Sequence, residues 1–523
     1  MKNTKTMLRR TAAGLLAAGL LALGAAQAAP AAAGDGRIAV DAKAKGTPFP
    51  HYWERMFGSG RAALALRDDY RKDLVAVKQA TGFGYVRFHG ILDEDVGLFH
   101  LGKNGQPFYN AADTSDKGGE PVYNFSYVDQ IYDGLLERGV RPFVELSFMP
   151  DDMSSDPKLI QDFWYRPNIA PPKSWALWDG MIRALAQHLI ARYGIDEVSQ
   201  WYFEVWNEPN IDFWGGVPRQ KSYFELYDHT ARALKSVSPR LRVGGPATAA
   251  AAWVGDFLAH AAKEHVPVDF VSSHGYADDT VQDLFHDDAP VSEDDRVCRA
   301  IGKVRGEIAA SPLPRLPLFW TEWNVPGRDN LRDTTYVGPA LANTVRECDG
   351  RVDMMSFWTF SDVFEEGGPS PEPFDGQFGM RASGGIDKPS YYDFALLHQL
   401  GDERLANPSG DVIVTRRKDG SLAVAAWNLV DPGRRGATRT LRLVFDHEPA
   451  DAGVTIQRVD DEHGNVLPVY ARLGSPRYPT MAQVEQMNAA TALPPPTQEH
   501  LDHGVLTLTL EPDALVLVTV AGH

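Results

Sequence analysis

Hydrophobic and polar positions alternate in two patterns along residues 51–399. Short runs that are apolar almost throughout, such as Pro142–Phe148, are typical of parallel strands that are buried on both faces. Longer segments carry apolar residues at spacings of three and four, as in Asp68–Ala80, and these predict helices. The predicted strands are Tyr85–Gly90, Pro121–Phe125, Pro142–Phe148, Trp201–Glu208, Leu241–Gly245, Phe270–Tyr276, Leu318–Glu322 and Met354–Phe360. Eight strands separated by helical segments predict an α/β fold, the (β/α)8 TIM barrel. Phe57–Leu66, ahead of these strands, is expected to be a glycine loop that runs into a helix.

The pattern changes in the last part of the chain, where apolar positions recur at every second residue. Val412–Val414 and Leu422–Trp427 follow this spacing and flank Asp419-Gly420, a pair that favours a tight hairpin turn. Val505–Leu510 and Leu515–Val520 repeat the pattern and are expected to pair with each other at the end of the chain.

These strands predict a C-terminal β-sandwich accessory domain over residues 400–523. Residues 476–492 interrupt the alternation and predict a helical insertion between strands. An early strand, Arg37–Ala42, has no place among the eight barrel strands. We therefore expect residues 37–50 to cross over and join the sandwich.

The first 28 residues have the pattern of a signal peptide. Basic residues precede an apolar segment, Ala12–Leu23, and Ala26-Gln27-Ala28 provides a cleavage pattern of small residues. Arg9-Arg10 leaves both the general secretory route and the twin-arginine route open. We expect an exported protein, periplasmic or extracellular, with no membrane partner after the signal has been removed.

The composition is that of an ordinary globular protein, with 44% hydrophobic and 23% charged residues among 523. A net charge of −17 argues against nucleic acid or an anionic membrane as a partner, because both attract basic surfaces. The chain contains no HExxH, CxxC or P-loop pattern, so we expect neither a metal nor another cofactor. Whether Cys298 and Cys348 pair, and whether the protein forms oligomers, stays open at this stage.

Two of the predicted strands end in a glutamate. Glu208 follows the fourth strand in WYFEVWNEPN, and Glu322 ends the seventh in PLFWTEWN. The carboxyl ends of barrel strands are where active sites lie, and two carboxylates about 5 Å apart suit a retaining glycoside hydrolase. Other strands end in polar or aromatic residues, namely His89, His274, Tyr276 and Trp358.

Several stretches resemble glycoside hydrolase family 39 of clan A, which contains β-xylosidases and α-L-iduronidases. They are GSGRAALALR, YVRFHGIL, DEDVGLF, VELSFMP, WNEPN, SSHGY, WTEWN, FWTFSDVFEEGG and PFDGQFGM, with SPRYPTMAQVEQM in the accessory domain. The chain departs from many relatives after the sixth strand, where Ala277 follows Tyr276 in place of a proline.

The resemblance implies a role for each residue of the site. It assigns Glu208 as the acid/base and Glu322 as the nucleophile, with Asn207 bound to the sugar 2-hydroxyl. The other implied contacts are His89, His274 and Glu366 as hydroxyl ligands, Tyr276 as a hydrogen-bond donor to the nucleophile, and Phe148 and Trp358 as apolar walls. Glu365 is an alternative to Glu366, because the repeat leaves the register open.

The substrate that the resemblance implies is a xylo-oligosaccharide, cleaved from its non-reducing end. An α-L-arabinoside, a β-glucoside or an exopolysaccharide is an alternative with the same chemistry, because fold and mechanism are kept when the substrate changes. A non-catalytic carbohydrate-binding barrel is a further alternative. An α-L-iduronide needs a cation for its carboxylate, for which Arg328 and Arg332 are the candidates.

Overall fold

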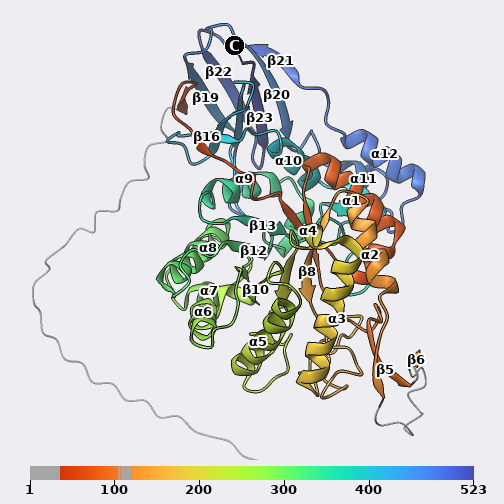
Figure 1. The fold of residues 1–523 in the computed structure, drawn as a ribbon. Helices are drawn as coiled ribbons and strands as arrows, with labels where there is room; N and C mark the ends of the chain where they lie inside the picture. The colour runs from red at the N-terminus through yellow and green to blue at the C-terminus, as the bar shows by residue number, and fades with distance from the viewer. Residues whose placement is uncertain (1–35, 104–105, 108–118, 523) are drawn as a thin grey trace, which may run out of the picture.

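The computed structural model describes residues 36–103, 106–107 and 119–522, which form a barrel and a sandwich (Figure 1). The expected export signal at residues 1–28 lies outside the described residues. In the described part of the chain, no helix combines the length and the apolar character that crossing a membrane requires.

Eight parallel strands close into a barrel, which confirms the predicted (β/α)8 fold. In the order around the barrel they are β3 (Met56–Gly58), β4 (Tyr85–Phe88), β8 (Arg141–Leu146), β9 (Tyr202–Val205), β10 (Arg242–Thr248), β11 (Phe270–His274), β12 (Leu318–Trp323) and β13 (Met354–Phe357). Glu322 therefore lies in the seventh strand, and Glu208 follows the end of the fourth, as expected from the sequence.

One predicted barrel strand is wrong. The first strand of the barrel is β3, which the sequence prediction treated as part of a loop. At three residues it is too short to show an apolar run, and a Cβ on its Gly58 would lie 2.0 Å from the Trp358 ring. The predicted second strand is β7 (Glu120–Tyr123), which pairs with β5 (Phe99–Lys103) in a small antiparallel sheet with β6 (Gln106–Pro107) outside the barrel.

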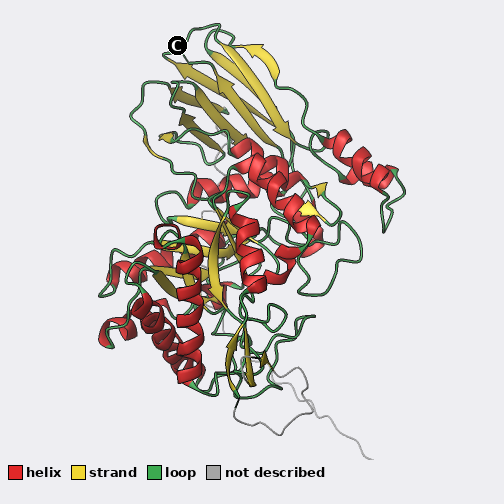
Figure 2. Cartoon of the chain, turned by 45° about the vertical axis from the view of Figure 1, so that its right-hand side comes forward, coloured by secondary structure: helices red, strands yellow, loops and turns green. Residues whose placement is uncertain are grey.

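Helices surround the barrel on the outside (Figure 2). They are α1 (Asp68–Thr81), α2 (Ser126–Leu136), α3 (Trp175–Tyr193), α4 (Ile195–Val198), α5 (Arg219–Val237), α6 (Val254–Lys263), α7 (Val281–Phe285), α8 (Glu293–Ala310), α9 (Val337–Glu347) and α10 (Pro389–Leu397). A disulfide joins Cys298 of α8 to Cys348, the residue after α9, and settles the pairing that the sequence left open. Short 3₁₀ turns lie at Ala62–Leu66, Ala249–Ala251 and Arg328–Asp333.

The last part of the chain folds into two sheets with an apolar core between them. One sheet has the order β1 (Arg37–Asp41), β19 (Arg439–Asp446), β22 (Val505–Leu510). The other has the order β2 (Thr47–Pro48), β16 (Glu403–Leu405), β17 (Val412–Arg416), β18 (Leu422–Trp427), β23 (Leu515–Val520), β20 (Gly453–Val459), β21 (Thr497–His500). The N-terminal strand β1 thus pairs in parallel with β19 of the sandwich.

The expected pairing of the last two strands is wrong. β22 pairs with β19, whereas β23 pairs with β18 and β20 in the opposite sheet. Both strands alternate in the same way because each buries one face in the shared core, so the alternation identifies strands but not their partners.

Two helices, α11 (Leu467–Arg472) and α12 (Met481–Thr491), lie between β20 and β21 in the chain. Thr480 and Gln483 form a capping box at the start of α12. Asn488 of α12 accepts a hydrogen bond from the backbone of Asp387 in the barrel domain at 3.0 Å, so the insertion contacts the barrel.

Inside the barrel, the inward-facing side chains change from apolar to charged along the strands. Met56, Phe143, Phe270, Phe319 and Met354 form an apolar cluster. Because side chains alternate along a strand, the next inward positions of β4, β8 and β9 are Arg87, Glu145 and Glu204, all fully buried. The barrel interior therefore supplies an apolar floor beneath a charged layer that supports the strand ends.

Candidate active site

Arg87 is the centre of the charged layer. Its guanidinium lies 2.7 Å from a Glu145 oxygen, 2.6 Å from Glu204 and 2.6 Å from Glu322. Arg87, Glu145 and Glu204 were not predicted as part of the site. Their sequence context does indicate a buried role, because each is a charged residue in a largely apolar strand, and such a residue needs a buried partner.

Glu322 is held at both of its carboxylate oxygens. Arg87 donates to Oε1 at 2.6 Å, and the hydroxyl of Tyr276 donates to Oε2 at 2.7 Å. Burial raises the pKa of Glu322 above its usual value, and the positive charges of Arg87 and His89 and the Tyr276 hydrogen bond oppose this rise. The donors thus favour the ionised form that a nucleophile requires. Tyr276 takes its expected place although no proline follows it.

Glu208 lies just beyond the end of β9 in a different environment. Its backbone has a φ of +42°, in the left-handed region that non-glycine residues seldom occupy. Its pKa is raised well above the usual value by burial and then by the negative charges of Glu322 and Asp279. Within the described residues, no arginine or lysine forms an ion pair with it. The environment of Glu208 therefore favours a protonated carboxyl group.

The two glutamates face each other at a short distance. An oxygen of Glu208 and an oxygen of Glu322 lie within 4.8 Å of one another. Retaining glycosidases place their carboxyl groups about 5–5.5 Å apart, whereas inverting enzymes need a wider gap for a water molecule. One protonated and one ionised carboxyl group at this spacing can perform a double displacement.

His274 contacts Glu208, lies close to Glu322 and is not among the residues that line the cavity. Its Nδ1 is 2.9 Å from Glu208 Oε1 and 3.6 Å from Glu322 Oε1, and its side chain is fully buried. Burial and the positive charges of Arg87 and His89 lower its pKa well below the usual value, so it is neutral. The predicted role of His274 as a sugar ligand therefore stays a prediction. The strand-end position was correct, but this side chain points between the carboxylates.

His89 and Glu366 lie together at the cavity wall. His89 Nδ1 is 2.7 Å from Glu145 Oε2, and Nε2 is 3.4 Å from Glu366 Oε1. Although burial opposes it, the negative charges of Glu145 and the hydrogen bonds to Glu145 and Glu366 raise the pKa of His89 to about 10. Glu365 points elsewhere and forms ion pairs with Arg61 and Arg67. Of the two glutamates that the sequence left open, Glu366 is the one that lines the cavity.

Asn207, Trp358 and Phe148 complete the predicted set. Asn207 lines the cavity, and its Oδ1 accepts a hydrogen bond from Arg87 at 2.9 Å, which leaves its NH2 end for a ligand. Trp358 lines the cavity as well, with its ring 4.9 Å from that of His89. Phe148 is fully buried, packs against Trp206 and is not among the lining residues, so its predicted role as an apolar wall stays a prediction.

The cavity has a volume of about 250 Å³. Five further lining residues were not predicted from the sequence: Phe163, Phe213, Asp278, Asp279 and Phe378. Arg332, a candidate from the sequence for holding a uronate carboxylate, lines the cavity as well. Arg332 lies with its Nη2 3.0 Å from Asp278 and its guanidinium 4.1 Å from the centre of the Phe378 ring. Arg328 forms an ion pair with Glu293 and is not among the lining residues.

Comparison with known families gives one match over most of the chain. Residues 36–499 match the model of "Glycosyl hydrolases family 39". The chain is 38% identical over 471 residues to a beta-xylosidase of Geobacillus stearothermophilus, covering 88% of this chain and 90% of that protein. It is 35% identical over 499 residues to a beta-xylosidase of Caldicellulosiruptor saccharolyticus, covering 90% and 95%.

Solved structures agree with this match. A family 39 beta-xylosidase from Caulobacter crescentus superposes with a TM-score of 0.79 at 33% identity, covering 92% of this chain and 99% of that one. In sequence, the chain is also similar to the alpha-L-iduronidase of Homo sapiens. The two are 34% identical over 125 residues, which cover 24% of this chain and 17% of that protein.

Proposed function

The chain belongs to glycosyl hydrolase family 39, and from this premise and the site geometry we propose that it is a retaining β-xylosidase. It removes xylose from the non-reducing ends of xylo-oligosaccharides by double displacement. The observation that carries the proposal is the pairing of Glu208 and Glu322, whose oxygens lie within 4.8 Å in contrasting environments. The beta-xylosidases that match about nine-tenths of the chain support the choice of sugar.

In the first step Glu208 donates its proton to the oxygen of the leaving group. Glu322 attacks the anomeric carbon at the same time, and the C–O bond to the leaving group breaks as a covalent glycosyl-enzyme forms. Arg87 and Tyr276 hold the Glu322 carboxylate so that it is ionised and oriented before the attack.

In the second step Glu208 acts as a base. Once Glu322 is esterified, its negative charge is gone, and with it one of the causes that raise the pKa of Glu208. Glu208 can then take a proton from water as the water attacks the anomeric carbon and releases the sugar. The coupling between the two carboxyl groups thus changes Glu208 from acid to base without a conformational change.

The cavity wall supplies the contacts for one sugar. The Asn207 NH2 group donates to the 2-hydroxyl, a contact that strengthens as the transition state gains oxocarbenium character. His89 and Glu366 bind further hydroxyls, and the Trp358 ring supports an apolar face of the sugar. A cavity of about 250 Å³ fits the end of a chain better than a long internal stretch of polysaccharide.

A uronic acid substrate is disfavoured by the charge of this cavity. Besides the protonated Glu208, its lining includes four acidic side chains: Asp278, Asp279, Glu322 and Glu366. Arg332 is the arginine of the lining that could bind a uronate carboxylate, but it already forms an ion pair with Asp278. In sequence, the alpha-L-iduronidases of dog, mouse and human align with less than a third of this chain. We therefore favour a xyloside over an iduronide as the substrate.

Export is part of the proposal. The N-terminal pattern of basic, apolar and small residues supports it, and so does the disulfide Cys298–Cys348, because such bonds form and persist in oxidising compartments. Sequencing the mature N-terminus tests this, with Ala29 expected as the first residue. A protein that keeps residues 1–28 and stays in the cytoplasm would contradict it.

A panel of aryl glycosides tests the reaction and the sugar. It contains a β-D-xyloside, an α-L-arabinoside, a β-D-glucoside and an α-L-iduronide, with Glu322→Ala as the control. We expect dominant cleavage of the xyloside and loss of several orders of magnitude in turnover in the variant. Cleavage of a different glycoside would replace the substrate but keep the mechanism. Equal binding of sugar by both proteins with no turnover would favour a carbohydrate-binding barrel.

A further inference from the structure

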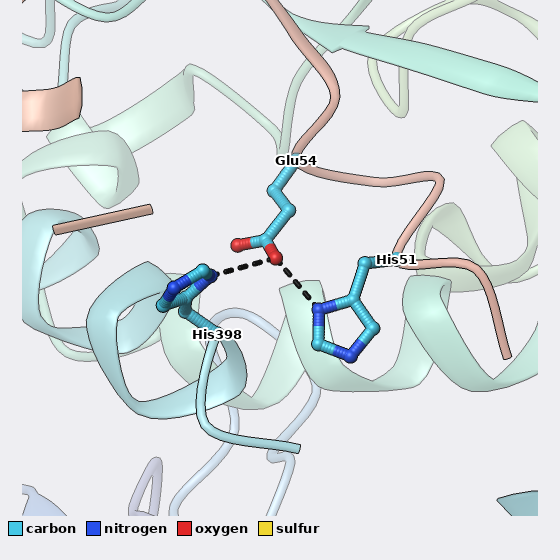
Figure 3. Close-up of side chains that lie close together, drawn as sticks. All are labelled: His51, Glu54 and His398. Carbon is cyan, nitrogen blue, oxygen red and sulfur yellow. Dashed lines mark hydrogen bonds and ion pairs between the residues drawn. The ribbon is translucent and has the colours of Figure 1, made fainter. Parts of the chain in front are cut away.

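His51, Glu54 and His398 form a cluster of ionisable side chains away from the active site (Figure 3). His51 and Glu54 lie in the segment before β3, and His398 is the residue after α10. The Nδ1 atoms of both histidines contact the same oxygen, Glu54 Oε1, at 2.7 Å for His51 and 2.9 Å for His398. The three ligand atoms lie within 4.8 Å of one another.

The cluster lies where the barrel meets the sandwich. The backbone NH of Phe49 donates to the carbonyl of Asp402 at 2.7 Å, and β2 pairs with β16. The segment that leads into the barrel and the segment that leaves it are thus adjacent, and the cluster joins them. None of its three residues lines the active-site cavity.

Two buried polar atoms of this cluster have no hydrogen-bond partner among the residues that the structure describes. They are Oε2 of Glu54, whose side chain is 5% exposed, and Nε2 of His51. One carboxylate oxygen therefore serves two imidazoles, while the other has lost its hydration without replacement. An unsatisfied carboxylate is costly to bury, and an ion or a water is the usual explanation.

The donor set indicates which ion fits. Two imidazole nitrogens and one carboxylate oxygen are ligands that suit Zn²⁺ and similar transition metals, whereas Ca²⁺ and Mg²⁺ prefer six or more oxygen ligands. His398 is 43% exposed, which provides access from solvent and a free position for a water ligand. A tetrahedral ion bound at about 2.0–2.2 Å needs its ligands slightly further apart than these hydrogen bonds, and the exposed ring of His398 can move by that amount.

We propose that His51, Glu54 and His398 form a structural site for a divalent transition metal, preferentially Zn²⁺, that ties the start of the barrel to its last helix. When the ion binds Nδ1, each neutral ring keeps its single proton on Nε2, and any second proton on a ring is released to solvent. The carboxylate gains a cation for its second oxygen. The sequence carries no motif for such a site because Glu54 and His398 are separated by 344 residues. The site stabilises the junction and takes no part in the hydrolysis.

Titration of chelator-treated protein with ZnCl2 tests the proposal, by calorimetry and by thermal unfolding. We expect one ion per chain, a rise in Tm that saturates at one equivalent, and unchanged xyloside turnover. Substitution of the exposed ligand, His398→Ala, should weaken binding about 100-fold and remove the rise in Tm. His503→Ala is the matched control, since His503 is also an exposed histidine, 96% exposed, outside the cluster.

Three results would overturn the proposal. The first is the absence of stoichiometric binding, which would leave the cluster as a hydrogen-bonded clamp. The second is binding that His398→Ala leaves unchanged. The third is binding that inhibits turnover, because Glu208, His274 and Glu322 form the other cluster of described residues with this spacing. Co²⁺ absorption of the bound protein provides a second measurement, and a tetrahedral spectrum that is lost in His398→Ala is the expected outcome.

Discussion

The hydroxyl of Tyr276 lies 2.7 Å from Oε2 of Glu322, on the opposite side of the carboxylate from Arg87. This hydrogen bond is directed at the group that attacks the sugar, and it is made by a residue from the neighbouring strand end. It is one of the interactions that lower the pKa of Glu322 against the effect of burial.

Replacement of this donor, Tyr276→Phe, should reduce kcat about 10- to 100-fold. The reason is that a hydrogen bond to a charged group contributes about 1.5–3 kcal/mol. The pKa of Glu322 should also rise, which moves the acidic limb of the kcat/KM profile to higher pH. Tyr85→Phe is the control, because its hydroxyl donates to the backbone of Gln200 instead. An unchanged pH profile with lower kcat would show that Tyr276 acts on the nucleophile only through packing.

The two adjacent glutamates on the last barrel loop should differ in their effects. Glu366→Gln removes a charged acceptor that lines the cavity, so kcat/KM should fall about 10- to 100-fold. Glu365→Gln weakens the ion pairs with Arg61 and Arg67, and it should change kcat/KM by less than about threefold. Steady-state kinetics of both variants on the aryl xyloside check this, and the reverse order of effects would contradict the assignment of Glu366.

Asp393 of α10 predicts a pH dependence of stability. It is fully buried, neither of its carboxyl oxygens has a hydrogen-bond partner in the described part of the chain, and burial raises its pKa well above 3.8. Between pH 3.8 and its folded-state pKa, the folded protein holds a proton that the unfolded chain has lost. The free energy of unfolding therefore falls as pH rises through this window, by about 1.4 kcal/mol per pH unit from this residue.

The variant Asp393→Asn removes this titration while keeping the shape of the side chain. We expect its Tm to exceed that of the unmodified protein at pH 7 and the two to converge near pH 4. The difference between the two Tm curves isolates Asp393 from other buried carboxyls, such as Asp73, whose pKa burial raises to about 7. A constant difference at all pH values would show that Asp393 is ionised in the fold.

The disulfide between Cys298 and Cys348 closes a loop of 50 residues across α8 and α9. Its removal in the double variant Cys298→Ala/Cys348→Ala should lower the free energy of unfolding by about 2–5 kcal/mol, because the unfolded chain regains freedom. Unfolding with and without reductant provides the measurement. Reductant should lower the Tm of the unmodified protein and leave that of the double variant unchanged. Equal Tm values for all four samples would contradict a structural role.

The sequence identified the barrel because most of its strands are long apolar runs with helices between them. The sequence did not predict elements whose position depends on tertiary contacts. β3 has only three residues, and its Gly58 is needed for the close approach of Trp358. β7 has the residues of a strand but belongs to an antiparallel sheet outside the barrel. The sequence also does not show which strands of the sandwich pair. Apolar and polar residues alternate in both β22 and β23, yet these strands lie in different sheets.

The site was predicted in part for similar reasons. Strand ends located Glu208, Glu322, His89, Tyr276 and Trp358 at the correct rim, because position on a strand fixes the rim. Side-chain direction is not fixed in this way: His274 and Phe148, also predicted to contact the sugar, are not among the residues that line the cavity.

The charged layer below the rim was missed entirely. Each of the three strands carries one fully buried charged residue: Arg87, Glu145 or Glu204. These charges can be buried because Arg87 forms ion pairs with both glutamates. Only the closed barrel brings the three strands together around the guanidinium, with Glu322 as the fourth member. A charged residue at an inward position of a buried strand indicates a buried partner of opposite charge on another strand.

Mass spectrometry after incubation with an activated 2-deoxy-2-fluoro-β-D-xyloside tests the central claim most directly. The fluorine destabilises the oxocarbenium-like transition states of both steps, and the good leaving group lets the first step proceed, so a covalent intermediate accumulates. We predict that the protein gains the mass of one fluoroxylosyl group and that the label is on Glu322. A label on Glu208, or complete turnover of other xylosides with no label and with inversion at the anomeric carbon, would contradict the account.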